Sequence, residues 1–257
     1  MIRWLIAALC VGVARNAPAQ AIDSLGQIDV DRPDFTDGVA TVAWRHIQVE
    51  SGYTYSSASG RGVGYQHSFP ELLVRIGVAR GVELRLSDNF IVINAGRSVG
   101  RRSGFDDFDL GTKVRFLSQH GVLPGISAEA SVAVPTGEAD VSGNHDRLLP
   151  AGAMILGWQG EGPWSAGFEA FASATADDAG SGTASLSVQY QMSQRWQLYV
   201  EGFIVRPLDG GGGTERYTDS GVHFFLSNDL QFDARIGAGL GSPSTHWIIG
   251  SGFALRH

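Results

Sequence analysis

The sequence predicts an all-β protein, a transmembrane antiparallel β-barrel of about twelve strands. Three observations predict this fold class. Apolar and polar residues alternate with a period of two in segments of about ten residues, as in strands whose two faces meet different surroundings. The connections between these segments are alternately short and long, and aromatic residues gather near the segment ends. No segment after the N-terminus keeps an apolar stripe at helical spacing, so helices are not expected.

Residues 1–21 have the order of a secretory signal peptide: Arg3, an apolar run over 4–13, and small residues up to Ala21. An apolar run of about ten residues is short for a membrane-spanning helix, which needs about twenty. Cys10, the only cysteine of the chain, lies inside this segment. We therefore expect a secreted mature protein without a disulfide or a thiolate metal site.

Residues 22–45 precede the first expected strand and are rich in aspartate. Two interpretations stay open for this segment. It is either an ordinary periplasmic lead-in or a plug that folds into the lumen, where its aspartates would pair with lumen arginines. The residues expected to form such a plug are Asp31, Arg32, Pro33, Asp34 and Phe35.

Residues 46–257 form the predicted barrel domain, with both ends on the periplasmic side. The expected strands are 46–56, 71–79, 82–90, 106–117, 125–134, 150–158, 164–173, 183–191, 196–205, 217–226, 230–239 and 246–257. Short turns on one side and longer loops on the other are typical of outer-membrane barrels, in which the short turns are periplasmic.

Alternation alone also permits a soluble lipocalin-like barrel with the apolar set inside. Three features favour the membrane. The apolar face carries one charge, Asp88, and a basic residue there at mid-membrane would cost about 2–4 kcal/mol. The final strand runs to the end of the chain, with Gly252 and Leu255 at the places usual for outer-membrane barrels and His257 in place of the usual terminal aromatic. Aromatic residues form two girdles, one near the short turns and one at the opposite rim: Phe116, Trp158, Trp164, Tyr190, Trp196, Phe224 and Phe232, and then Tyr53, Tyr55, Phe90 and Trp247.

Several short motifs resemble the outer-membrane family labelled "putative MetA pathway of phenol degradation". They are spread over the chain at 31–37 (DRPDFTD), 50–55 (ESGYTY), 71–77 (ELLVRIG), 82–85 (VELR), 110–113 (LGTK), 135–137 (PTG) and 232–237 (FDARIG). The resemblance implies an outer-membrane barrel with a transporter-like role, and it supports location and fold more than cargo.

If the apolar set faces lipid, the polar set lines the lumen. The predicted lining residues are Glu50, Arg75, Glu83, Arg85, Asp107, Asp109, Lys113, Arg115, Glu129, Glu169, Glu201, His223, Asp233, Arg235 and Arg256. Both charge signs are present in near balance, so sharp ion selectivity is not expected. Two interpretations stay open: cross-strand ion pairs that brace and fill the lumen, or the lining of a narrow selective pore.

The net charge of −7 argues against a nucleic-acid partner. No G-x-S-x-G or H-E-x-x-H motif occurs, and no serine–histidine pair lies on the apolar face, so we expect no catalytic residues, metal or cofactor. We expect a channel or transporter in the bacterial outer membrane that passes small molecules, with aromatic or hydrophobic compounds as candidate cargo. The alternative is a non-conducting structural barrel with a filled lumen. Expected partners are outer-membrane lipid, lipopolysaccharide and the barrel assembly machinery.

Overall fold

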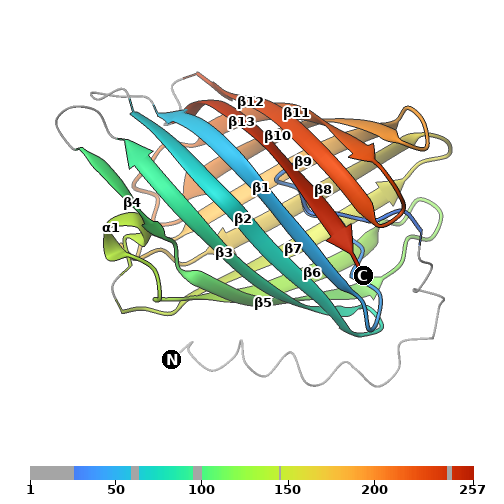
Figure 1. The fold of residues 1–257 in the computed structure, drawn as a ribbon, viewed down its shortest axis with the longest axis horizontal. Helices are drawn as coiled ribbons and strands as arrows, with labels where there is room; N and C mark the ends of the chain where they lie inside the picture. Colours follow the sequence, from blue (N-terminus) through green and yellow to red (C-terminus); the bar gives the residue numbers. More distant parts are fainter. Residues whose placement is uncertain (1–25, 59–63, 95–99, 145, 242–244) are drawn as a thin grey trace.

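The chain folds into one closed antiparallel β-barrel in the computed structural model, which describes residues 26–58, 64–94, 100–144, 146–241 and 245–257 (Figure 1). The predicted signal peptide, residues 1–21, lies outside the described residues. The strands are β1 (Ile47–Ala58), β2 (Gly64–Ala79), β3 (Val82–Asn94), β4 (Arg101–Phe105), β5 (Phe108–Leu117), β6 (Gly125–Val134), β7 (Leu149–Gln159), β8 (Trp164–Ser173), β9 (Ser181–Gln191), β10 (Trp196–Pro207), β11 (Glu215–Phe225), β12 (Leu230–Leu240) and β13 (Thr245–Arg256).

These strands occupy twelve positions around the barrel. Each pairs with its neighbours in sequence, and β1 pairs with β13 to close the ring. β4 and β5 share one position, because both pair with β3: β4 with its end near Asn94 and β5 with its end near Val82. The predicted fold class is confirmed.

Most strand bounds lie within two residues of the predicted ones, and the larger differences are at β2, β3 and β4. The strand expected at 106–117 begins at Phe108, while β3 runs on to Asn94 and β4, Arg101–Phe105, lies within the segment 91–105 that was expected to be a loop. β2 begins at Gly64, within the segment 57–70 that was expected to be a loop. That prediction was wrong because this part of β2 projects beyond the aliphatic band. Pairing with β1 and β3 satisfies its backbone there, so hydropathy does not mark it.

One described helix, α1 (Ala139–Ser142), lies in the connection between β6 and β7. None of the described helices is long or apolar enough to span a membrane. The short connections and both ends of the barrel domain lie at one end, here called the short-turn end, on the right of Figure 1. The other end, which carries α1, is called the long-loop end.

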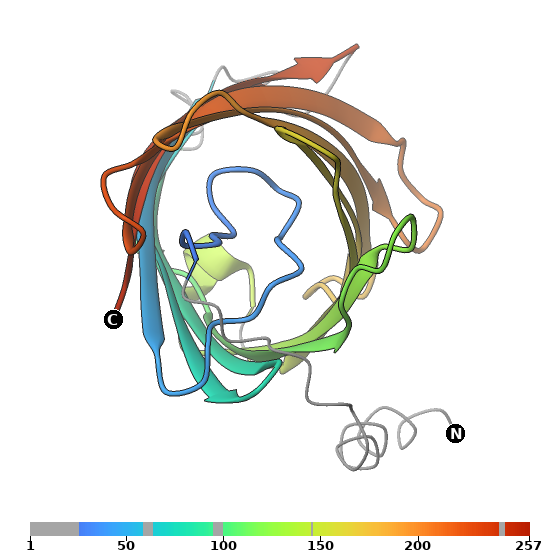
Figure 2. The ribbon, with the colours of Figure 1, turned by 90° about the vertical axis from the view of Figure 1, so that its right-hand side faces the viewer.

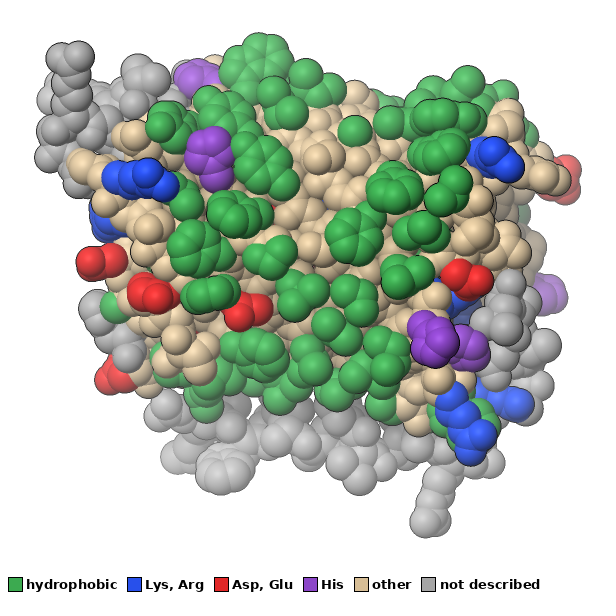
Figure 3. All heavy atoms as spheres, viewed as in Figure 1, with side chains coloured by type: hydrophobic (Ala, Val, Ile, Leu, Met, Phe, Trp, Pro, Cys, Tyr) green, Lys and Arg blue, Asp and Glu red, His purple; other side chains and the backbone are tan. Residues whose placement is uncertain are grey.

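The burial pattern is the reverse of a soluble barrel. Large apolar side chains point outward, with Trp164 and Val200 each 54% exposed, while Arg75 and Lys113 are buried in the interior. Figure 3 shows hydrophobic side chains across the middle of one outer face. Water would penalise such a surface and lipid would not, so the apolar set is the lipid-facing one. Trp164 and Tyr190 pack at 4.6 Å between ring centroids near the short-turn end, within one of the predicted girdles.

Candidate functional site: the lumen and the segment inside it

Residues 26–45, here called the inner segment, lie inside the barrel (Figure 2, where they are blue). The segment is fastened where it enters at the short-turn end. The Ile28 amide donates to the Asn228 carbonyl at 2.8 Å, and the Arg256 guanidinium donates to the Gly26 carbonyl at 2.7 Å. Ile28 also packs with Phe225 and Ala254 in a small apolar cluster. The chain then loops through the lumen and returns to β1.

Asp31 is the centre of a buried ion cluster. Its carboxylate accepts hydrogen bonds from Lys113 at 3.1 Å and from Arg85, and lies 3.1 Å from the Arg75 guanidinium. Burial alone would raise the pKa of Asp31, but attraction by Arg75, Lys113 and Arg85 outweighs it and holds this pKa far below its ordinary value. The carboxylate is therefore ionised throughout the neutral pH range.

The strand register brings like charges together at this place in the wall. Antiparallel pairing of β2 with β3 sets Arg75 directly opposite Arg85, and like charges so placed repel. Glu83 accepts from both guanidinium groups, at 2.9 Å from Arg75 and 3.1 Å from Arg85. Glu50 accepts from Arg75 at 3.0 Å. Asp31 adds a carboxylate from the inside that pairs with both arginines, so ion pairs join the inner segment to this wall.

The cluster extends to β6 through Glu129, which lies 3.0 Å from Lys113 and 3.2 Å from Arg85. Asp31, Asp37 and Glu129 could bring three carboxylate oxygens within 4.8 Å of one another, which is close enough for a metal ion. Arg85 and Lys113 already lie among them, and each of these two cations pairs with all three carboxylates. The arrangement is thus an ion-pair network in which Arg85 and Lys113 provide the positive charge that a metal ion would otherwise provide.

The opposite side of the inner segment contacts β8, β9 and β10 through hydrogen bonds to carboxylates and hydroxyls. The Asp37 amide donates to Glu169 at 2.8 Å, and the Phe35 amide donates to Glu201 at 2.8 Å. The Ser187 hydroxyl donates to Asp34 at 3.1 Å. Burial, and then repulsion by Glu201, raise the pKa of Asp34 well above its ordinary value. Asp31 thus lies among cations, whereas Asp34, three residues later, lies near the carboxylate of Glu201.

Glycines in the wall make room for the inner segment. A Cβ on Gly52 would lie 2.0 Å from the Arg32 guanidinium, and one on Gly252, its partner across β1 and β13, would lie 2.6 Å from it. A Cβ on Gly77 would lie 2.0 Å from the Ala43 carbonyl oxygen. The missing side chains let the segment approach the wall, so the wall is shaped to hold it.

Arg32 and Phe35 extend these contacts toward the long-loop end. Arg32 pairs with Glu71 at 2.6 Å and lies 3.8 Å from Asp233. The centroids of the Phe35 and Phe203 rings lie 4.1 Å apart. The Arg235 guanidinium lies over the Phe35 ring, 4.9 Å from its centroid. Arg235 also donates to the Pro33 carbonyl at 2.6 Å. All five residues expected to form a plug, Asp31 to Phe35, therefore touch the lumen wall or one another inside the barrel.

The remaining predicted lining residues have varied surroundings. Asp107 accepts from the Asn144 side chain at 2.6 Å and fastens the β6–β7 connection. Asp109 accepts from Ser131 at 3.2 Å. His223 is buried between the rings of Tyr199 and Phe225. Arg256 pairs with Asp229 at 2.6 Å at the short-turn end, and Arg115 borders a cavity described below.

Sequence reasoning missed several buried lumen residues: Gln48, Asp219, Ser127, Ser185, Ser187 and Gln231. Gln48, Ser127, Asp219 and Gln231 share the strand phase of a predicted lining residue, as Gln48 does with Glu50, so the period-two pattern could have found them. Ser185 and Ser187 lie on β9, where no lining residue was predicted. All of these residues except Asp219 are uncharged, and the predicted lining set contained only titratable residues, whereas this lumen is lined as much by hydroxyl and amide groups as by charges.

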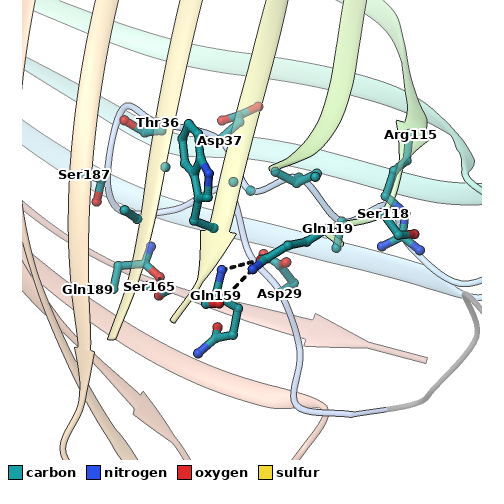
Figure 4. A pocket seen from close by; sticks show the side chains of 18 of the residues that line it. Asp29, Thr36, Asp37, Arg115, Ser118, Gln119, Gln159, Ser165, Ser187 and Gln189 are labelled. Atoms are coloured by element: carbon teal, nitrogen blue, oxygen red, sulfur yellow. Dashed lines mark hydrogen bonds between the residues drawn. The ribbon is translucent and has the colours of Figure 1, made fainter. Parts of the chain in front are cut away.

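Three cavities remain around the inner segment. An outer cavity of about 730 Å³ lies at the long-loop end and is bordered by Asp37, Glu169 and Asp109. A side cavity of about 270 Å³ separates residues 36–40 from β5 to β9 (Figure 4). A mouth of about 730 Å³ at the short-turn end is bordered mainly by glutamines, among them Gln159 and Gln191. The lumen is thus partly filled rather than solid.

Comparison with known proteins supports the fold and the resemblance. Residues 30–257 match the family described as "Putative MetA-pathway of phenol degradation". No curated protein sequence matches.

Among solved structures, the chain is similar to the COG4313 outer membrane channel from Pseudomonas putida F1, with a TM-score of 0.62 and 15% identity over 89% of this chain and 100% of that one. It is also similar to the NanC porin, with a TM-score of 0.54 and 9% identity over 81% and 98% of the two chains. A third likeness, with a TM-score of 0.51 and 13% identity over 82% and 88%, is to the translocator domain of the autotransporter NalP from Neisseria meningitidis. At these identities the likenesses show the fold, which is that of outer-membrane barrels.

Proposed function

Because the chain belongs to the family described as "Putative MetA-pathway of phenol degradation", we propose that it is an outer-membrane channel for small molecules. Aromatic compounds are the candidate cargo, since the family description names a phenol pathway. We further propose that the barrel contacts outer-membrane lipid and lipopolysaccharide through its apolar outer face, and that the barrel assembly machinery inserts it.

One observation carries this proposal. The polar lumen holds a segment that leaves open space beside it, in cavities of about 270 and 730 Å³. A barrel built only as a structural element gains most by filling its interior, because empty space forfeits packing contacts. A channel gains by keeping a narrow polar passage, in which size and lining groups select what enters. A structural neighbour is described as an outer membrane channel, which supports the channel over the purely structural barrel.

The test is the current through the purified protein in a planar lipid bilayer. We expect the full chain to give small, steady single-channel steps. Deletion of residues 27–38 removes the centre of the inner segment and should raise the conductance several-fold, since a twelve-stranded barrel lies between the filled eight-stranded kind and open porins of about sixteen strands.

The alternative is a non-conducting barrel with a filled lumen. It predicts that the full chain is silent. An unchanged current after the deletion would show that the segment does not obstruct the lumen. Heat-modifiable mobility on a gel, which reports an intact barrel, is the control that separates a closed channel from a protein that has lost its fold.

A further inference from the structure

We propose that molecules cross this barrel along one side only, in a route that follows the inner face of β8, and that this route favours neutral and cationic molecules over anions. The inference rests on the proposed channel function and adds to it a path, a constriction and a charge preference.

The inner segment occupies the side of the lumen opposite β8. Arg32 lies against the wall where Gly52 and Gly252 leave no side chain, and the backbone at Ala43 lies against Gly77. The Phe35 ring packs on Phe203, which stacks on Tyr217 at 4.8 Å between centroids. From β10 through β13 and β1 to β3, the inner segment therefore contacts the wall directly.

The three cavities follow one another along β8. The five inward-facing positions of this strand are Ser165, Gly167, Glu169, Phe171 and Ser173. Each of them borders a cavity, and their order in the strand is the order of the cavities from the mouth to the long-loop end. The mouth and the side cavity share Gln159 and Ser165, while the side and outer cavities share Asp37. Among the described strands, β8 is the only one that both borders all three cavities and has every inward-facing residue on one of them.

Small side chains create this space. The wall beside residues 36–40 has small inward-facing residues, Gly125, Gly157, Gly167 and Ser165. Val39 and Thr36 of the inner segment take up part of this room, since a Cβ on Gly157 would lie 2.3 Å from the Val39 side chain, and the side cavity is what remains. Figure 4 shows Ser165, Ser187 and Gln189 bordering the side cavity, with Asp37 and Thr36 of the inner segment across from them. Hydroxyl and amide groups of this kind can replace the hydration of a neutral polar molecule as it passes.

The constriction lies between the side and outer cavities, where the Asp37 amide donates to Glu169 at 2.8 Å. This contact bridges the inner segment and β8. A molecule that moves from one cavity to the other must pass beside it. Glu169 is therefore the residue of the wall that each permeating molecule meets at closest range.

The charge preference follows from the outer cavity. Eight of its bordering residues are acidic, Asp109 and Glu129 among them, and two are basic, Arg32 and Arg85. Arg85 is already neutralised by Asp31, Asp37 and Glu129. Clefts lined by one sign of charge raise the local concentration of opposite ions, and acidic rings favour cations. Anions are thus repelled before they reach Glu169.

The test of the path uses single-cysteine variants in a Cys10→Ser background, studied as full chains in planar bilayers. Ser165→Cys lies on the proposed route. Thr54→Cys is the matched control, because Thr54 also faces the lumen but is buried against Arg235 at 3.0 Å. A cationic methanethiosulfonate reagent should reduce the current through Ser165→Cys by half or more and leave the current through Thr54→Cys unchanged.

Ser173→Cys repeats the test in the outer cavity if Ser165→Cys does not assemble. A block at Thr54→Cys without a block at Ser165→Cys and Ser173→Cys would overturn the path while leaving the channel function intact. A wild-type protein that carries no current would overturn the proposed function itself, and the path with it. The two failures are therefore distinguishable.

The charge preference is tested with the same Ser173→Cys variant. A cationic methanethiosulfonate should react about tenfold faster than an anionic one of similar size, because the outer cavity concentrates cations. Glu169→Gln, which keeps the shape of the side chain, should lower the cation-to-anion permeability ratio of the channel. Equal reaction rates together with an unchanged permeability ratio would overturn the preference.

Discussion

The two sides of the lumen hold the same inner segment by different physical means. On one side Arg75, Arg85 and Lys113 surround Asp31 in a buried ion network. On the other side Glu169 and Glu201 accept hydrogen bonds from the segment's backbone. We call these the cationic wall and the acidic wall. The side cavity lies beside the acidic wall, on the side with the weaker attachment, and the outer cavity borders Glu169 on this wall as well as Arg85 on the cationic wall.

The difference in strength has a physical basis. A hydrogen bond contributes about 0.5–1.5 kcal/mol net, because water would satisfy the same groups in the detached state. Removing one partner of a buried ion pair costs about 3–5 kcal/mol, because the remaining charge is left without compensation. We therefore expect the cationic wall to anchor the inner segment, and any movement of the segment to occur beside the acidic wall.

Asp31→Asn gives the largest expected effect. It leaves Arg75, Arg85 and Lys113 with one carboxylate fewer in a buried site, and should weaken the attachment of the inner segment by about 3–5 kcal/mol. We expect the single-channel conductance to rise toward that of the deletion of residues 27–38.

Asp34→Asn is the matched control, since Asp34 lies on the acidic wall and has Ser187 rather than a cation as its partner. It should change the conductance far less. If Asp34→Asn opened the channel as much as Asp31→Asn, the contrast between the walls would be wrong.

A steric pair gives an intermediate effect. Gly77→Ala puts a Cβ 2.0 Å from the Ala43 carbonyl oxygen, a backbone atom that cannot turn aside. This overpacking should lower the free energy of unfolding by about 1–3 kcal/mol. Gly167→Ala on the acidic wall puts its Cβ 3.0 Å from the Thr36 methyl group. It should cost at most about 1 kcal/mol, because a side chain beside a cavity can move.

Urea titration of both glycine variants in lipid vesicles, with the heat-modifiable gel band as a second reading, measures this difference. Equal losses of stability would mean that the acidic wall holds the segment as tightly as the cationic wall does.

Much of the architecture could be predicted from the sequence because barrel strands obey a strict local rule. Alternation puts Glu50, Arg75 and Glu83 on one face whatever their partners are, and the membrane keeps the other face apolar. The same rule set twelve strand positions correctly. It failed at β2, where the strand continues beyond the apolar band, and at 106–107, where pairing with β3 is broken.

The arrangement inside the lumen could not be predicted in the same way. The fit of Asp31 among three cations depends on a segment of irregular backbone, whose path is set by contacts with residues far away in sequence, such as Lys113. The glycines at 52, 77 and 252 looked like ordinary strand glycines, and their role appears only when the segment lies against them. Alternation fixes which wall residues face inward, whereas it carries no information on what they meet there.

The smallest expected effect is the pH dependence that Asp34 contributes at the acidic wall. The pKa of Asp34 is raised by burial and by Glu201, so its contribution to holding the segment is present at low pH and is lost as pH rises through that raised value. The pKa of Asp31 is lowered, so its contribution is present above its ordinary pKa and changes little between pH 5 and 8. Acidification through the raised pKa of Asp34 should therefore tighten the acidic wall and reduce the conductance, by a factor of about two to five if one hydrogen bond of about 1 kcal/mol is at stake. Asp34→Asn, which is neutral at every pH, should flatten this response, and a conductance that instead rises on acidification would place the responding group elsewhere in the lumen.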